Sequence, residues 1–242
     1  MTGALLTVDM VSKRFGGFAA LTDVSLTVGQ GERLGIIGPN GSGKTTLINC
    51  ICGSLRSDGG SIRFGDSDIT RLAAHRRTRL GIARSFQIPR PFSSMTLVEN
   101  VAVPLEYVTH RRLLDRADVR TEALAILARM GLDGKADVYA SALTQVDLRK
   151  LELARALAAR PRLLILDEVM AGLSSVEVDE VLGIVLGLNR EGVTIIMIEH
   201  IMRAIMRFSE RVICFDAGRI MAEAPPQQIV NDPNVQRIYL GA

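Results

Sequence analysis

The sequence lacks the features that define several other classes of protein. It contains no run of about 18 apolar residues, the length that a helix needs to cross a bilayer, so we expect no membrane-spanning segment. Residues 1–9 show no basic region and no cleavage pattern, which argues against secretion. No heptad run, internal repeat or low-complexity tract is found either. We therefore expect neither a coiled coil nor a second, fused domain of the same kind.

Cysteine is scarce and the net charge is small. The 3 cysteines fit a reducing compartment. Cys50 and Cys52 lie two positions apart on an expected helix and face different sides, so they suit neither a metal pair nor a disulfide, and Cys214 is expected in the core. The net charge of +3 is too small to indicate a nucleic acid partner, but it is compatible with the inner surface of an anionic membrane. With 242 residues, 48% of them apolar, the chain can form one large α/β domain with a smaller insert.

The strongest positive signal is a glycine-rich run at residues 38–45, which matches the phosphate-binding loop pattern. An apolar run at 34–37 predicts a buried strand before it, and residues 45–51 predict a helix after it. The backbone N–H groups of such a turn and the positive end of the helix dipole converge on one point, where a phosphate binds. The sequence therefore predicts a nucleoside triphosphate site. Its expected binding residues are Gly38, Asn40, Gly41, Ser42, Gly43, Lys44, Thr45 and Thr46.

Two further apolar runs end in polar residues. The run 163–166 reads as a buried parallel strand that ends in Asp167 and Glu168. We expect Asp167 to hold Mg²⁺ and Glu168 to orient or deprotonate a water, with a solvated strand end as the alternative. The run 193–198 is followed by Glu199 and His200, and His200 is placed to contact a γ-phosphate, with a structural histidine as the alternative.

The arginine-rich segment 71–79 is expected to be a solvated helix face, with a membrane-facing role as the alternative. His75 in this segment and His110 in a second basic stretch are expected to be solvated.

With these three strands in this order, the chain resembles the ATP-binding subunits of ABC transporters over nearly its full length. The resemblance implies that residues 38–45 are the Walker A loop, that 163–167 are the Walker B strand, and that ATP and Mg²⁺ are the cofactors. Glu168 takes the place of the catalytic glutamate and His200 that of the switch histidine. Gln87 corresponds to the Q-loop glutamine, so the expected metal ligands are Thr45, Gln87 and Asp167. Phe15 falls where the family stacks an aromatic ring on adenine, with ordinary core as the alternative.

The chain departs from the family at the elements that face a partner's nucleotide. The signature corresponds to Leu143, Thr144, Val146 and Asp147, with Gln145 between them. Val146 replaces a glycine whose bare backbone lets an N–H reach the partner's γ-phosphate; a branched side chain there adds bulk and would be strained at positive φ. In the D-loop, Ser174 stands where relatives often carry Asp or Asn, and Val169 replaces a proline.

The expected fold is α/β: a P-loop NTPase core of mainly parallel sheet with an antiparallel β-subdomain and an inserted helical subdomain. Residues 1–88 and 162–242 are assigned to the nucleotide-binding core and residues 89–161 to the helical signature subdomain. Four segments have sequences similar to those of the branched-chain amino acid importer ATPases: residues 83–87, 95–101, 198–200 and 235–241. The lipopolysaccharide exporter ATPase has a similar tail and remains an alternative.

The resemblance implies a peripheral ATPase on the cytoplasmic face of the inner membrane that powers amino acid import. The expected partners are integral permease subunits, a second ATPase chain and, indirectly, a periplasmic solute-binding protein. A heterodimer is favoured because the altered residues face the partner, and a homodimer is the alternative. Two other classes share part of this pattern. One is a weakly hydrolysing nucleotide-binding regulator, and the other is a DNA-repair ATPase head, which the missing heptads argue against.

Overall fold

A computed structural model describes residues 3–85, 89–108 and 116–240 of the chain. Its centre is a six-stranded sheet in the order β10-β9-β3-β8-β7-β6, in which β9 to β6 pair in parallel and β10 pairs antiparallel with β9. All five residues of β7 and of β8 are buried, as expected for strands covered on both faces. The strands are β3 Arg33–Ile37, β6 Ile82–Arg84, β7 Leu163–Asp167, β8 Thr194–Ile198, β9 Arg211–Asp216 and β10 Arg219–Ala224.

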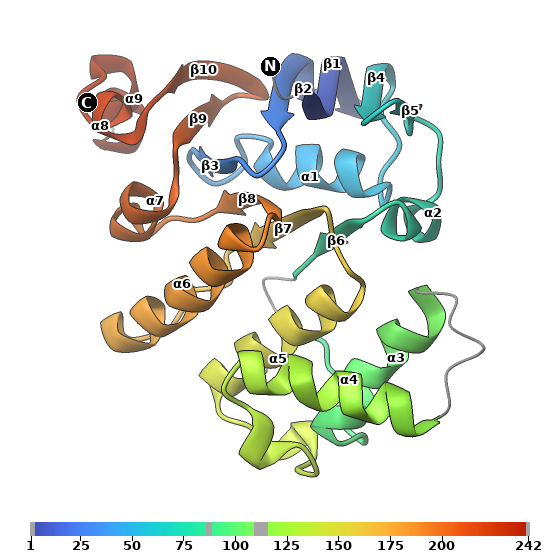
Figure 1. The fold of residues 1–242 in the computed structure, drawn as a ribbon. Helices are drawn as coiled ribbons and strands as arrows, with labels where there is room; N and C mark the ends of the chain where they lie inside the picture. The colour runs from blue at the N-terminus through green and yellow to red at the C-terminus, as the bar shows by residue number, and fades with distance from the viewer. Residues whose placement is uncertain (1–2, 86–88, 109–115, 241–242) are drawn as a thin grey trace.

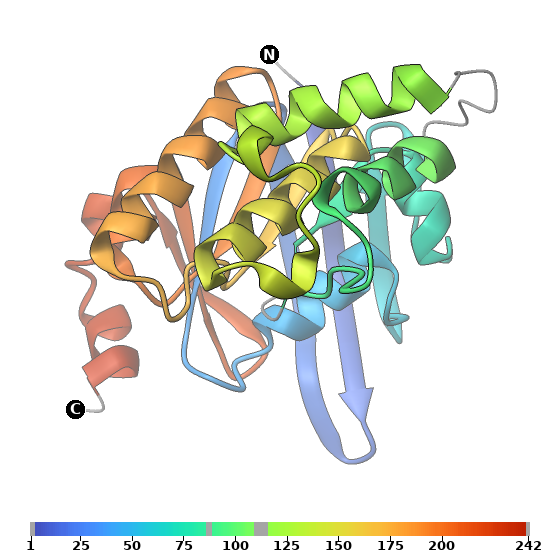
Figure 2. The same cartoon turned by 90° about the horizontal axis from the view of Figure 1, so that it is seen from below.

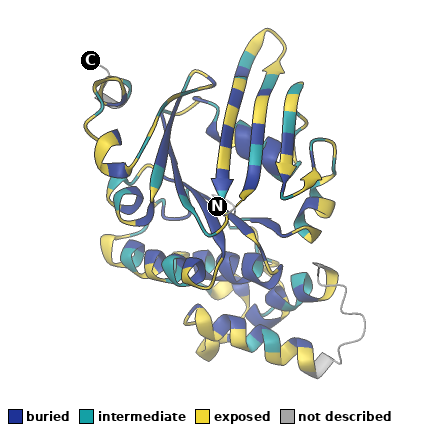
Figure 3. Ribbon diagram, turned by 45° about the horizontal axis from the view of Figure 1, so that its top comes forward, coloured by how far each residue is buried: buried dark blue, intermediate teal, exposed yellow. Residues whose placement is uncertain are grey.

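A second, antiparallel sheet has the order β2-β1-β4-β5. Its strands are β1 Ala4–Phe15, β2 Phe18–Gly29, β4 Gly59–Phe64 and β5 Ser67–Asp68. Buried and exposed residues alternate along much of β1 and β2, as Figure 3 shows, because one face packs on the core and the other faces solvent. Seen from below in Figure 2, the tip of the β1–β2 hairpin extends beyond the other elements. The apolar residues of β1, β2 and β4 share one buried cluster with α1 (Lys44–Cys52) and β3.

Between β6 and β7 the described chain is helical and forms no strand. Its elements are α3 Leu97–Val108, α4 Arg116–Arg129, the 3-10 turns Asp133–Lys135 and Ala140–Ala142, and α5 Gln145–Ala158. These helices gather on one side of the six-stranded sheet (Figure 1). One continuous apolar cluster runs from them into the sheet, so the assignment of residues 89–161 to a separate subdomain stays a prediction.

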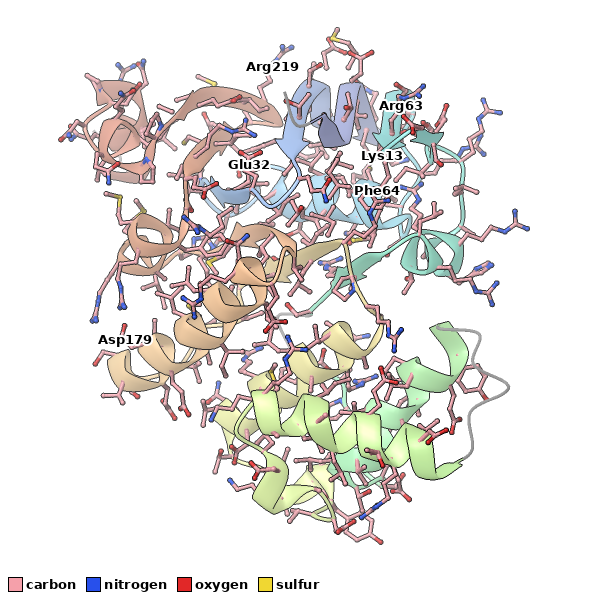
Figure 4. All side chains as sticks on the ribbon, viewed as in Figure 1. Lys13, Glu32, Arg63, Phe64, Asp179 and Arg219 are labelled. Carbon is pink, nitrogen blue, oxygen red and sulfur yellow. The ribbon has the colours of Figure 1, made fainter. Side chains whose placement is uncertain are left out.

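The remaining helices follow β5, β7, β8 and β10 along the chain. They are α2 Ala74–Arg79, α6 Ser175–Arg190, α7 Met202–Phe208, α8 Pro226–Ile229 and α9 Pro233–Leu240. Asp179 on α6, labelled in Figure 4, accepts hydrogen bonds from two arginines of α7, at 2.6 Å from Arg203 and more closely from Arg207. This pairing ties α7, which directly follows His200, to α6. The predicted α/β fold, with a mainly parallel sheet, an antiparallel sheet and inserted helices, is confirmed.

No helix among the described residues combines the length and the apolar character that crossing a bilayer requires.

One expectation about the arginine-rich segment is wrong. Arg77 is only 2% exposed, whereas Arg71, His75, Arg76 and Arg79 are exposed as expected. The Arg77 guanidinium donates to the carbonyl oxygens of residues 50 and 51 at 2.6 and 2.8 Å, and to those of residues 70 and 72. It is buried because the last carbonyls of α1 have no partners within the helix and carry the negative end of its dipole. His110 lies outside the described residues.

Candidate nucleotide-binding site

The loop between β3 and α1 curls around a point just beyond the carboxyl end of β3. Gly38, Gly41 and Gly43 all have positive φ, at 149°, 79° and 107°. A Cβ on Gly38 would lie 2.3 Å from the Phe215 oxygen, and one on Gly43 would lie 2.6 Å from the Ala20 oxygen, so neither position accepts a larger residue. No side chain caps the start of α1. Its first N–H groups therefore remain available for an anion.

Lys44 extends back into this loop. Its Nζ donates to the carbonyl oxygens of Gly38 at 2.7 Å and Pro39 at 2.9 Å, and the residue is only 5% exposed. Burial lowers the pKa of Lys44, while the negative charges of Glu168 and Asp167 act in the opposite direction. A cation thus lies inside the loop, next to the free N–H groups of α1.

Two aromatic rings close one side of the same hollow. A cavity of about 250 Å³ is lined by Phe15, Phe18, Ala20, residues 40–46 and Glu168. Phe15 and Phe18 face each other across the β1–β2 hairpin and are 52% and 63% exposed. The alternative that Phe15 is ordinary core is therefore wrong. Phe18 was not predicted as a site residue, since only the cross-strand pairing brings it beside Phe15.

The two carboxylates that end β7 point to different partners. Asp167 Oδ2 lies 2.5 Å from Arg84 Nη2, and both side chains are nearly buried. Glu168 Oε1 lies 2.8 Å from His200 Nε2. Glu168 has a φ of 51°, unusual for a non-glycine residue, and its N–H donates to the Ile198 carbonyl at 2.9 Å. Such strain is typical of functional positions, because the surrounding structure must hold it.

Glu199 is a neighbour of the site whose role was not predicted. It is 1% exposed, and its Oε1 accepts a hydrogen bond from the Met170 N–H at 2.8 Å. Burial raises the pKa of Glu199 to about 7, and the negative charge of Glu168 adds to that rise. Glu199 therefore anchors the segment that follows Glu168 while remaining easy to protonate.

The oxygen donors around the loop fit Mg²⁺. The described candidates are the Thr45 hydroxyl at the start of α1 and the Asp167 carboxylate at the end of β7; Gln87, the third predicted ligand, lies outside the described residues. In the described part of the chain, no group of three or more His, Cys, Asp or Glu side chains could hold a metal. Mg²⁺ suits such a sparse set, since it usually keeps several waters and binds one or two carboxylates together with substrate phosphates.

The predicted signature residues lie at the start of α5 and do not line the hollow. Thr144 is the N-cap: its Oγ1 accepts the Asp147 N–H at 3.3 Å and donates to Asp147 Oδ2 at 2.8 Å, while Lys135 Nζ lies 2.5 Å from the same carboxylate oxygen. Val146 lies in the first turn of α5, is half-buried, and is not among the residues with positive φ. The strain expected at positive φ therefore does not arise. Leu143 packs against the main apolar cluster.

Ser174 has a structural task that its sequence position did not reveal. Its hydroxyl accepts the Glu177 N–H at 3.4 Å, and Glu177 Oε2 accepts the Ser174 N–H at 2.8 Å, which completes a capping box at the start of α6.

Comparison with known proteins agrees with this geometry. A family model described as ABC transporter matches residues 21–171, and one described as branched-chain amino acid ATP-binding cassette transporter matches residues 219–242. The chain belongs to the ABC transporter family, as one of its ATP-binding, ATP-hydrolysing subunits. The predicted resemblance is confirmed.

The relatives match along their whole lengths. The chain is 36% identical to the high-affinity branched-chain amino acid transport ATP-binding protein LivG of Escherichia coli K12, covering 100% of this chain and 99% of that protein. A LivG protein of Archaeoglobus fulgidus is also 36% identical, over 98% and 96%. The lipopolysaccharide export system ATP-binding protein LptB of Haemophilus influenzae is 34% identical, over 98% of each.

Solved structures confirm the P-loop ATPase fold. An ATP-binding cassette of an ABC transporter in its ADP conformation superposes with a TM-score of 0.90 at 32% identity, covering 100% of both chains. A dimeric cassette in a post-hydrolysis state, bound to ADP and phosphate, gives a TM-score of 0.83 at 26% identity, over 91% of this chain and 98% of that one.

The buried carboxyl of Glu199 predicts a pH dependence of stability. Its pKa is raised from 4.5 to about 7 in the folded state, so the folded chain holds a proton that the unfolded chain releases. Stability that is fully present below pH 4.5 is therefore lost as the pH rises toward about 7. Glu199→Gln keeps the oxygen that accepts from Met170 and removes the titration. We expect the free energy of unfolding, measured with urea, to fall less over this window in the variant than in the wild type. Parallel pH profiles of the two proteins would contradict the assignment.

Proposed function

We propose that this chain is the ATPase subunit that powers import of branched-chain or related amino acids, as a peripheral protein on the cytoplasmic face of the inner membrane. The observation that carries the catalytic part is the 2.8 Å contact of Glu168 with His200 beside the phosphate loop. The choice of solute is supported by the names of the LivG relatives, which are branched-chain amino acid transport proteins, and by the family match at residues 219–242. The LptB relative, at a similar identity, supports lipopolysaccharide export as the alternative.

Each side chain of the hollow has a task that its chemistry supports. The N–H groups at the start of α1 and the Lys44 ammonium hold the β- and γ-phosphates, and Phe15 and Phe18 pack against the adenine. Thr45 and Asp167, with Gln87, hold Mg²⁺, which neutralises charge on the phosphates when it is bound. Glu168 orients the attacking water and takes its proton, and His200 positions Glu168 and contacts the γ-phosphate.

The permease docks beside this site in the same proposal. A groove of about 480 Å³ lies between α2, β6 and the helices α3 and α5, and its apolar wall includes Ile82, Val103, Pro104 and Ala156. Phe92, 41% exposed, packs under the Arg155 guanidinium at the edge of this region. We expect the segment from Gln87 through Phe92 to Met95 to receive a short permease helix, and Arg90 within this segment lines the groove.

The second ATPase chain is a different protein in this proposal. The residues that act on the chain's own nucleotide, among them Lys44, Asp167, Glu168 and His200, all have their expected identities. The altered ones, Val146 in the signature and Ser174 in the D-loop, are those that would face the partner's nucleotide. Asp147 places a carboxylate in the first turn of α5, where a phosphate of the partner's site would meet like charge. A heterodimer confines this defect to one of two sites.

The catalytic proposal predicts separable effects of two substitutions. Glu168→Gln should leave ATP binding nearly intact and lower hydrolysis by roughly 10²-fold or more, because the water loses its base. Lys44→Ala should weaken binding itself. Phosphate release and ATP-dependent leucine uptake by the assembled transporter in vesicles measure both activities. Retained turnover in Glu168→Gln would remove Glu168 from its role, and hydrolysis without leucine uptake would favour the export alternative.

If the second ATPase chain is a different protein, the two ATP sites should contribute unequally to turnover. With its partner in the assembled transporter, Glu168→Gln in this chain should nearly abolish turnover, because this site pairs intact Walker residues with the partner's intact signature. The equivalent change in the partner should cost much less. Single-site variants compared in one preparation measure the difference. Equal losses would mean that the sites are equivalent and that Val146 is tolerated.

A further inference from the structure

Arg84, at the end of β6, forms an ion pair with the carboxylate assigned to Mg²⁺. Its Nη2 lies 2.5 Å from Asp167 Oδ2, and its Nη1 donates to Asn49 Oδ1 at 2.6 Å. The side chains of Arg84 and Asp167 are 12% and 5% exposed. One guanidinium therefore joins the end of β7 to α1, the helix that follows the phosphate loop.

The backbone around this ion pair is fixed by sheet pairing. Arg84 pairs with Ile165 in the parallel ladder of β6 and β7, two residues before Asp167. The Ser85 N–H continues the ladder by donating to the Ile165 carbonyl at 2.9 Å. Arg84 also lines the groove between β6, α3 and α5. Its side chain therefore reaches Asp167 from the groove side of the sheet.

The charges around the Arg84–Asp167 ion pair affect how a metal ion can bind Asp167. Among the described residues, Arg84 is paired with Asp167, and the negative charges of Asp167 and Glu168 also act on the Lys44 ammonium. A carboxylate within reach of a guanidinium and of a divalent cation must share its oxygens between them, and burial strengthens both attractions. A metal ion that approaches Asp167 therefore meets a positive charge already in place.

We propose that Arg84 is a positioning residue that neutralises Asp167 while no metal is bound and competes with Mg²⁺ for its carboxylate. The inference rests on the proposed metal site at Asp167. Its consequence is a limit on how strongly Mg²⁺ enhances ATP binding. With Arg84, ATP that carries no metal meets the Arg84 guanidinium as well as the Lys44 ammonium. Without Arg84 it loses one of these two positive charges, and Mg²⁺ meets no guanidinium at Asp167.

The test is the ratio of the ATP dissociation constants measured in EDTA and in excess Mg²⁺, obtained by calorimetry on the whole chain. Arg84→Gln removes the charge and keeps a hydrogen-bond donor toward Asp167. We expect this ratio to rise by about tenfold, chiefly because metal-free ATP binds more weakly. The matched control is Arg211→Gln on β9, four strands away from β6 in the same sheet, which breaks a part-buried ion pair with Glu32, at 2.7 Å, and one with Glu223. The control should leave the ratio unchanged.

The outcomes separate this inference from the proposed function. A wild-type ratio near one would contradict the metal site itself. A wild-type ratio well above one that is unchanged in Arg84→Gln would overturn the competition while leaving the metal site in place. If Arg84→Gln fails to fold, Arg84→Lys keeps the charge but cannot bridge Asp167 and Asn49 together. It should raise the ratio by about threefold, and no rise would overturn the inference.

Discussion

The site depends on the parallel register of three strands. β8 pairs with β7 so that Ile198 lies beside Asp167, and β3 pairs with β8 so that Ile198 also lies beside Ile36. The residues that follow the three strands therefore emerge at one edge of the sheet, where open α/β sheets place their ligands. The phosphate loop, the Glu168 carboxylate and the His200 imidazole meet there although more than a hundred residues separate the first from the others.

Much of this could be predicted from sequence because the signals are local. A strand, glycine turn and helix lie within residues 34–51, and the acids of β7 directly follow its apolar run. Arg77 was misjudged and Glu199 was missed because their environments come from distant segments, the end of α1 and the Met170 backbone. Phe18 was missed although its partner Phe15 lies only three residues away, across the turn of the β1–β2 hairpin. No local pattern marks an arginine that will be buried by carbonyl groups 26 residues away.

The residues that depart from the family pattern have different structural roles. Ser174 forms a capping box with Glu177, so its side chain stabilises the start of α6. Val146 adopts an ordinary helical conformation, so only its bulk remains as a difference from glycine. Asp147, beside Val146, carries a carboxylate that Lys135 contacts at 2.5 Å. Val146 thus differs from the family's glycine in bulk rather than in backbone strain.

The central claim is that one hollow, between the β1–β2 hairpin and the carboxyl ends of β3, β7 and β8, binds ATP for hydrolysis. A crystal structure of the Glu168→Gln chain with ATP and Mg²⁺ tests it most directly. We expect the γ-phosphate between Lys44 and His200, the metal at Thr45 and Asp167, and the adenine against Phe15 or Phe18. A nucleotide bound in the groove between α2 and α3, or phosphates out of reach of Lys44, would contradict it.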